Sequence, residues 1–242
     1  MIRKSLKNQI IVSLLAVISV LICVSCTQVT PEITQSDYSI IFDFDKEEEL
    51  PSARLSLFMA SETNVRRYQR IKITALETGY VWDSQNIAIL EEEGTQWAGV
   101  TNLVAPENEK LPCGKYEVTY YNADEKECTI TLEIKYDIDF YDVLFSALPE
   151  VMKQKRGIEK IAIYDKEHIL IYFGDKTKEF QTARGIWNVY RDAGTYQDIW
   201  YSRDGTVTCI GPEKPVKPET DKTADTDADS DAEADADTDI EE

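Results

Sequence analysis

Histidine, methionine and cysteine are scarce in this sequence. Its 242 residues include one histidine (His168), three methionines and five cysteines. A serine or cysteine hydrolase site would have to use His168, and a site with two histidine ligands is excluded. The sequence also lacks a Gly-x-Ser-x-Gly elbow, a phosphate-binding loop, a dinucleotide fingerprint and a zinc motif. We interpret His168 as an exposed turn residue, and we predict a protein that is not an enzyme, with no cofactor and no metal site.

Positive charge is the second scarcity. The chain has 26 Lys and Arg against 45 Asp and Glu, which gives a net charge of −19. The excess is spread over the body, which carries −12 over residues 27–212, and the last 30 residues, which carry −10. Nucleic acids and anionic lipid surfaces bind to clustered positive charge, so neither is expected as a partner. The short run Lys153, Lys155 and Arg156 is interpreted as a solvated helix end.

Long hydrophobic runs are absent except near the N-terminus. Residues 10–24 are almost wholly apolar and follow the basic residues Arg3, Lys4 and Lys7. Fifteen residues are fewer than the ~20 that a spanning helix needs. The order of basic, apolar and small residues predicts a secretory signal that is removed from the mature protein. A cysteine, Cys26, follows the small residue Ser25 at the expected cleavage site.

The box Cys23-Val24-Ser25-Cys26 resembles the cleavage box of bacterial lipoproteins, in its relaxed, spirochaete-like form. The resemblance implies cleavage after residue 25, lipidation of Cys26 and attachment of the protein to a membrane of the cell envelope. Thr27 favours the outer membrane over the inner one. Residues 26–37 are polar and aperiodic, and we interpret them as a tether. Cleavage without lipid, which would release a soluble protein, and a spanning helix are the alternatives.

The remaining cysteines, Cys113, Cys128 and Cys209, are an odd number, which is not the pattern of a disulfide scaffold. We predict buried, free thiols. Cys113 and Cys128 are expected at opposite ends of one hairpin, too far apart for a disulfide bridge. A bridge from Cys209 to either of them remains open.

Residues 38–136 read as a series of short strands with no helix between them. β-branched and aromatic residues alternate with polar ones, and Gly, Pro, Asn and acidic clusters separate the runs. This pattern predicts a mainly β fold with an antiparallel β-sandwich. The expected strands are 38–44, 53–60, 70–76, 80–82, 86–90, 97–104, 115–121 and 127–136.

The segment 111–134 sharpens the expected fold. Gly114-Lys-Tyr116 opens a strand, and a second strand follows after a polar turn. This hairpin resembles the last hairpin of bacterial immunoglobulin-like domains. The resemblance implies that Tyr116 packs at a corner, with its hydroxyl bonded to backbone, and that the sandwich is immunoglobulin-like.

The texture changes after residue 136. Helical spacing at 140–152, a hairpin at 160–173, a short helix near 183–191 and a hairpin at 199–210 predict a small α+β unit over residues 137–212. Residues 213–242 are rich in Asp and Ala, and we expect a disordered acidic tail. The acidic clusters around Asp43 and Asp137 are interpreted as solvated edges.

Together these observations predict a lipid-anchored envelope protein that works as a non-enzymatic binding or scaffolding module. Its partners are the membrane, through the anchor, and a protein or glycan ligand that the sequence does not identify. A periplasmic assembly factor is the first alternative. A hydrolase with an unrecognised pair of carboxylates is the second, because two acids brought together by a fold leave no local motif.

Overall fold

A computed structural model gives the fold, and it describes residues 32–61, 65–107, 109–123 and 126–216. The predicted signal 1–25, Cys26, the start of the tether and residues 217–242 lie outside these ranges.

Strands make up most of the described chain, which confirms the mainly β prediction. Each expected run of alternating residues contains a strand, with boundaries shifted by a few residues. The strands are β1 (Ile33–Asp43), β2 (Ser52–Ser61), β3 (Tyr68–Ala75), β4 (Val81–Ser84), β5 (Ala88–Glu92), β6 (Thr95–Val104), β7 (Gly114–Asn122), β8 (Glu127–Ile134), β9 (Ile158–Asp165), β10 (Leu170–Asp175), β11 (Ala193–Tyr201), β12 (Val207–Ile210) and β13 (Lys214–Pro215).

The helices are short and lie after β8, apart from one turn before β3. The helical spacing at 140–152 becomes two 3-10 turns and one α-helix, because Pro149 is accepted only in the first turn of a helix. The elements are η1 (Val65–Arg67), η2 (Ile138–Asp142), η3 (Phe145–Ala147), α2 (Leu148–Gln154), η4 (Lys178–Gln181) and α3 (Ala183–Val189).

The strands form two sheets. One has nine strands in the order β10-β9-β11-β12-β1-β2-β6-β5, with β13 paired to β11, and the other has four in the order β4-β3-β7-β8. The nine-stranded sheet is mixed, because β1 pairs in parallel with β12, with Ile40 opposite Val207 and Phe42 opposite Cys209. The strand pairs within the predicted sandwich 38–136 are antiparallel, and the parallel pair joins that region to β12 of the following unit, which the prediction did not include. The paired residues are 167 positions apart in the chain, and partners so distant leave no local sequence pattern.

The β1–β12 pair also joins the two predicted units. The sandwich expected over 38–136 contributes β1, β2, β5 and β6 to the same sheet as strands of the predicted α+β unit 137–212. One hydrophobic core contains residues from both, including Phe42, Phe140 and Cys209. A smaller core lies around Ile163, Phe180 and Ile186. The sheet and the larger core therefore run through the predicted boundary at residue 136.

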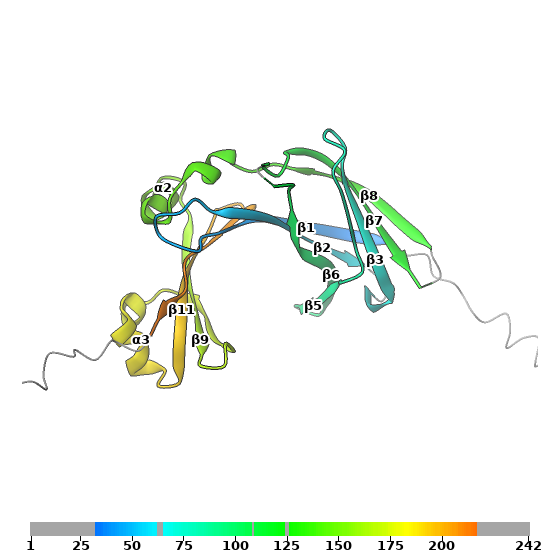
Figure 1. Cartoon of the computed structure of the whole chain (residues 1–242). Helices are drawn as coiled ribbons and strands as arrows, with labels where there is room; N and C mark the ends of the chain where they lie inside the picture. The colour runs from blue at the N-terminus through cyan, green and yellow to red at the C-terminus, as the bar shows by residue number, and fades with distance from the viewer. Residues whose placement is uncertain (1–31, 62–64, 108, 124–125, 217–242) are drawn as a thin grey trace, which may run out of the picture.

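The nine-stranded sheet is curved into an arch (Figure 1). The four-stranded sheet lies outside one limb of the arch, and α2 and α3 lie outside the other. Strand alternation turns Ile40 and Phe42 toward these covering elements, and Ser39, Ile41 and Asp43 toward the concave side. No element of the described part of the chain covers the concave side (Figure 1).

The chain is ordered a few residues beyond the predicted end of the fold. Residues 213–216 were expected in the disordered tail, but β13 pairs with β11 and Val216 is fully buried. The N–H of Val216 donates to the carbonyl oxygen of Gly194 at 2.9 Å. Lys214 and Pro215 resemble the tail in composition, and only their pairing with β11 shows that they belong to the fold.

Candidate functional site

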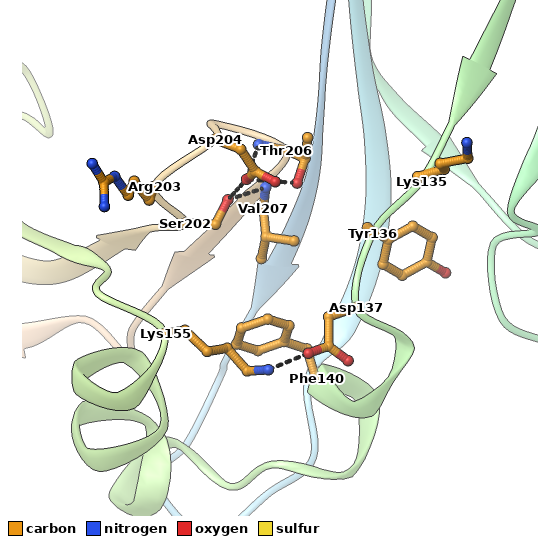
Figure 2. Close-up of a pocket in the computed structure, with 10 residues that line it drawn as sticks. All are labelled: Lys135, Tyr136, Asp137, Phe140, Lys155, Ser202, Arg203, Asp204, Thr206 and Val207. Atoms are coloured by element: carbon orange, nitrogen blue, oxygen red, sulfur yellow. Dashed lines mark hydrogen bonds and ion pairs between the residues drawn. The ribbon is translucent and has the colours of Figure 1, made fainter.

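A pocket opens where the end of β8, η2, the C-terminal end of α2 and the β11–β12 turn meet (Figure 2). Its volume is about 630 Å³. The residues that line it come from three separate stretches of the chain: Lys135, Tyr136, Asp137, Phe140, Lys155, Ser202, Arg203, Asp204, Thr206 and Val207.

The lower part of the pocket combines an ion pair with an aromatic ring. The Lys155 ammonium pairs with the Asp137 carboxylate and lies 5.6 Å from the centre of the Phe140 ring (Figure 2). The hydrogen bond from Lys155 lowers the pKa of Asp137, with help from the backbone N–H of Asp139 and against a smaller effect of burial. Asp137 also caps η2 through the Asp139 N–H. Its carboxylate is therefore ionised and fixed in direction at neutral pH.

The opposite wall is the β11–β12 turn, which Asp204 organises. Its Oδ1 accepts hydrogen bonds from Ser202 Oγ at 2.6 Å, Thr206 Oγ1 at 2.9 Å and Thr206 N at 3.2 Å (Figure 2). The bond from Ser202 is the main cause of the lowered pKa of Asp204. The Asp204 carboxylate therefore stabilises the turn, and its Oδ1 is already occupied by three hydrogen-bond donors of that turn.

Two cations stand on the rim of the pocket. Lys135 lies 2.8 Å from Glu133 and is mostly exposed. Arg203, which extends away from the pocket in Figure 2, makes no ion pair with any described residue. The pocket thus has an apolar floor, two occupied carboxylates and a cationic rim. This set can bind an anion.

The concave side of the arch has a second hollow, of about 380 Å³. Residues of five strands line it, from Gln197 on β11 across to Asn102 on β6. Arg54 closes one end by binding Asp43 through Nε and Nη2, at 2.6 and 3.2 Å, and by donating to the Thr101 carbonyl oxygen. The curvature of the sheet is what brings strands so far apart in sheet order to one hollow.

Aromatic and apolar side chains continue along this concave side. By register, Phe173, Tyr201 and Phe58 point to it, and the rings of Phe173 and Tyr201 meet edge to face at 6.4 Å. The Phe58 ring lies across Gly99, where an added Cβ would be 2.6 Å from the ring. Polar groups lie among them, such as the Ser39 and Thr208 hydroxyls, 2.9 Å apart. The surface therefore mixes apolar bodies with hydrogen-bonding groups.

The residues singled out from the sequence are scattered over the fold. Cys26, the predicted lipidation site, lies outside the described residues. His168 is in the expected β9–β10 turn, exposed, with Nε2 3.2 Å from Glu213. In the described ranges, no group of three His, Cys, Asp or Glu side chains is placed to hold a metal ion. Crossing a membrane takes a longer, more apolar helix than any in the described part.

The three body cysteines are free, so none of the disulfide bridges considered is formed. Cys209 is buried, as predicted, and burial raises its pKa to about 12. Cys113 is exposed and Cys128 is partly exposed, which corrects the prediction of buried thiols for these two. Cys113 directly precedes β7 and Cys128 is the second residue of β8, so the two lie at opposite ends of the hairpin, as expected.

Sequence reasoning did not find either hollow. Arg203 and Asp204 lie within the hairpin predicted at 199–210, and Lys155 was interpreted only as part of a short basic run. Among the large aromatic residues, Trp97 and Tyr201 lie on the concave side by register, while Tyr80, Trp82, Trp187 and Trp200 pack against the cores. No protein-family model matches this sequence, and no curated protein matches it.

Proposed function

We propose that this chain is a lipid-anchored protein of the bacterial cell envelope, and that it acts as a non-enzymatic binding module. Its ligand would be an extended polypeptide segment of a partner protein, held on the concave side of the nine-stranded sheet. The uncovered concave side is the observation that carries the proposal.

We infer that the two facing sheets form an immunoglobulin-like sandwich. The four-stranded sheet lies against β1, β2 and β6 across the larger core. Tyr116 is buried, and its hydroxyl donates to the Pro112 carbonyl oxygen at 2.7 Å, the arrangement of a tyrosine corner. Folds of this class carry many functions, so the function rests on the surface and not on the fold.

The chemistry of the concave side favours a polypeptide. Exposed aromatic and apolar side chains alternate there with hydroxyl and amide groups, which suits a chain that offers both side chains and peptide groups. Strands β5 and β10 pair on one side only, so each limb of the arch ends in free backbone donors and acceptors. The net charge of −19 disfavours an acidic segment.

Peptide selection on the anchored protein tests the binding site. Random twelve-residue peptides would be selected against the mature, lipidated chain in nanodiscs. Phe173→Asp and Leu90→Asp place a charge on opposite limbs of the concave side, at positions 49% and 50% exposed. We expect each to weaken the selected peptides about tenfold, as loss of an anchor contact does. Val189→Asp is the matched control, since Val189 is 50% exposed on α3, outside the arch.

Failure to enrich any peptide, or peptides that bind all three variants equally, would refute a binding site on the concave side. The anchor is tested separately by Cys26→Ala. This variant should lose incorporation of labelled palmitate and move from the membrane to the soluble fraction. Membrane retention of the variant would refute the lipid anchor while leaving the binding site standing.

A further inference from the structure

The pocket of Figure 2 gathers positive charge on a molecule that is otherwise strongly acidic. Lys135, Lys155 and Arg203 line it. Lys153, in the last turn of α2, and Arg156, just beyond the helix, are close to Lys155 in the chain. Close packing brings α2 to the β11–β12 hairpin, because an added Cβ on Gly157 would lie 3.0 Å from the Tyr201 carbonyl oxygen. Three cations therefore line a pocket that contains two carboxylates, and two more lie close to Lys155 in the chain.

The two carboxylates leave much of the donor capacity of these cations unused. Asp204 is occupied by the donors of its own turn. Asp137 takes one of the three N–H donors of Lys155, and Arg203 spends none of its five on an ion pair with a described residue. Further carboxylates would find charged donors here without displacing an existing contact.

The same chain carries a dense series of carboxylates outside the described residues. Residues 217–242 contain twelve Asp and Glu and two Lys, a net charge of −10. They begin directly after Val216, which is anchored to Gly194. Twenty-six residues reach up to ~85 Å when extended. A folded body of about 185 residues has a radius of gyration of only ~16 Å, so the pocket is within reach.

We propose that this pocket is a binding site for a polycarboxylate chain, and that its occupant is segment 217–242 of the same molecule. Covalent connection gives the segment an effective concentration near the millimolar range, which compensates for the weakness of each exposed ion pair. In the bound state, several carboxylates of the segment contact the cations on the rim, and the segment covers the apolar floor of the pocket. The concave side is not involved, so this site is independent of the binding surface proposed above.

Carbodiimide cross-linking of the full mature chain tests the assignment, because it joins lysines directly to carboxylates in contact with them. Mass spectrometry then counts the lysines joined to acids of 217–242. A segment that is only tethered would react most with Lys166, which lies beside the exit point: its Cα is 3.1 Å from the Cβ position of Gly194. A segment bound in the pocket would react most with Lys135, Lys153 and Lys155, and we expect this result.

Paired variants make the test specific. Arg156→Gln with Arg203→Gln removes two cations that carbodiimide cannot cross-link, and should reduce pocket cross-links about fivefold. Arg184→Gln, an exposed arginine on α3, is the control and should leave them unchanged. Added salt at ~0.5 M should lower the same cross-links by screening. Dominant cross-links to Lys166, cross-links between molecules, or pocket cross-links unaffected by the double variant would each overturn the proposal.

Discussion

The hydroxyl of Tyr116 donates a hydrogen bond to the carbonyl oxygen of Pro112, four residues earlier in the chain, at 2.7 Å. The ring is buried and stacks near Trp82, and Gly114 between the two partners adopts a φ of +126° that favours glycine. The bond fixes the entry of the chain into β7, the strand that pairs with both β3 and β8.

Removing this hydroxyl should destabilise the fold. Tyr116→Phe keeps the ring and leaves the Pro112 carbonyl without its donor, so we expect a loss of about 1–2 kcal/mol in the free energy of unfolding. Urea denaturation followed by fluorescence measures it. Tyr121→Phe, on the same strand but only half-buried, should change the stability by less than about 0.5 kcal/mol. Equal losses of stability in the two variants would contradict the claim that the Tyr116–Pro112 hydrogen bond stabilises the fold.

Asp198 should be a second sensitive position. Its carboxylate lies 2.9 Å from the Lys176 ammonium, and the two side chains are only 11% and 15% exposed. Burial lowers the pKa of Lys176, but the carboxylates of Asp198 and Glu159 outweigh this effect and raise it. Asp198→Asn leaves a partly buried ammonium with one carboxylate, and we expect a loss of about 2–3 kcal/mol.

The matched control for Asp198 is Asp175→Asn. Asp175 also pairs with a lysine, Lys160, but its side chain is 78% exposed. Water screens this pair, and we expect a change below about 0.5 kcal/mol. A comparable loss in both variants, measured by thermal unfolding, would show that burial of the Lys176 pair is not what makes it matter.

Asp204 predicts a pH dependence. Its pKa is lowered in the folded protein, so its stabilisation is complete above the unfolded value of about 3.9 and is lost as pH falls through the lower folded value. Asp204→Ala should therefore cost about 1 kcal/mol at pH 7, after allowance for solvent screening. The difference from the wild type should shrink below about pH 4. Urea titrations from pH 3 to pH 7 measure it, and a constant difference would contradict this account.

The thiols should react in a fixed order. Cys209 is buried and its pKa is raised to about 12, so almost no thiolate exists at pH 8. Because the thiolate is the reacting species, iodoacetamide should label the exposed Cys113 first and Cys209 only after unfolding. Peptide mapping after timed labelling measures the order. Labelling of Cys209 as fast as Cys113 in the folded chain would contradict its burial.

Local pattern predicted the strands well and their arrangement only in part. The β7–β8 hairpin was predictable because Tyr116, Val118 and Tyr120 alternate with polar residues and a polar turn follows. The pairing of Ile40 with Val207 was not, since a buried strand accepts any apolar neighbour and the connection between them is most of the chain. The curvature of the sheet also depends on this long-range pairing, and it could not be predicted from the sequence either.

The site was less predictable than the fold. A hairpin at 199–210, which contains Arg203 and Asp204, and a basic run ending at Arg156 were both predicted from the sequence. That they face each other across one pocket depends on β9 and β11 lying side by side, with Ile158 opposite Tyr201. Binding surfaces made of distant segments leave no spacing to read, unlike a metal site or a nucleotide loop.

The place of β1 in the sheet has a consequence for how the molecule forms. The N-terminus of the chain is synthesised first, but one neighbour of β1 is β12, near the end of the fold. Until residues 207–210 arrive, β1 and β2 are a hairpin with one bare edge, open to pairing with other chains. Closure of the arch is a late, long-range event, and long-range closures are slow. In the interval between the synthesis of β1 and that of β12, the edge of β1 is thus the part of the fold most open to mispairing.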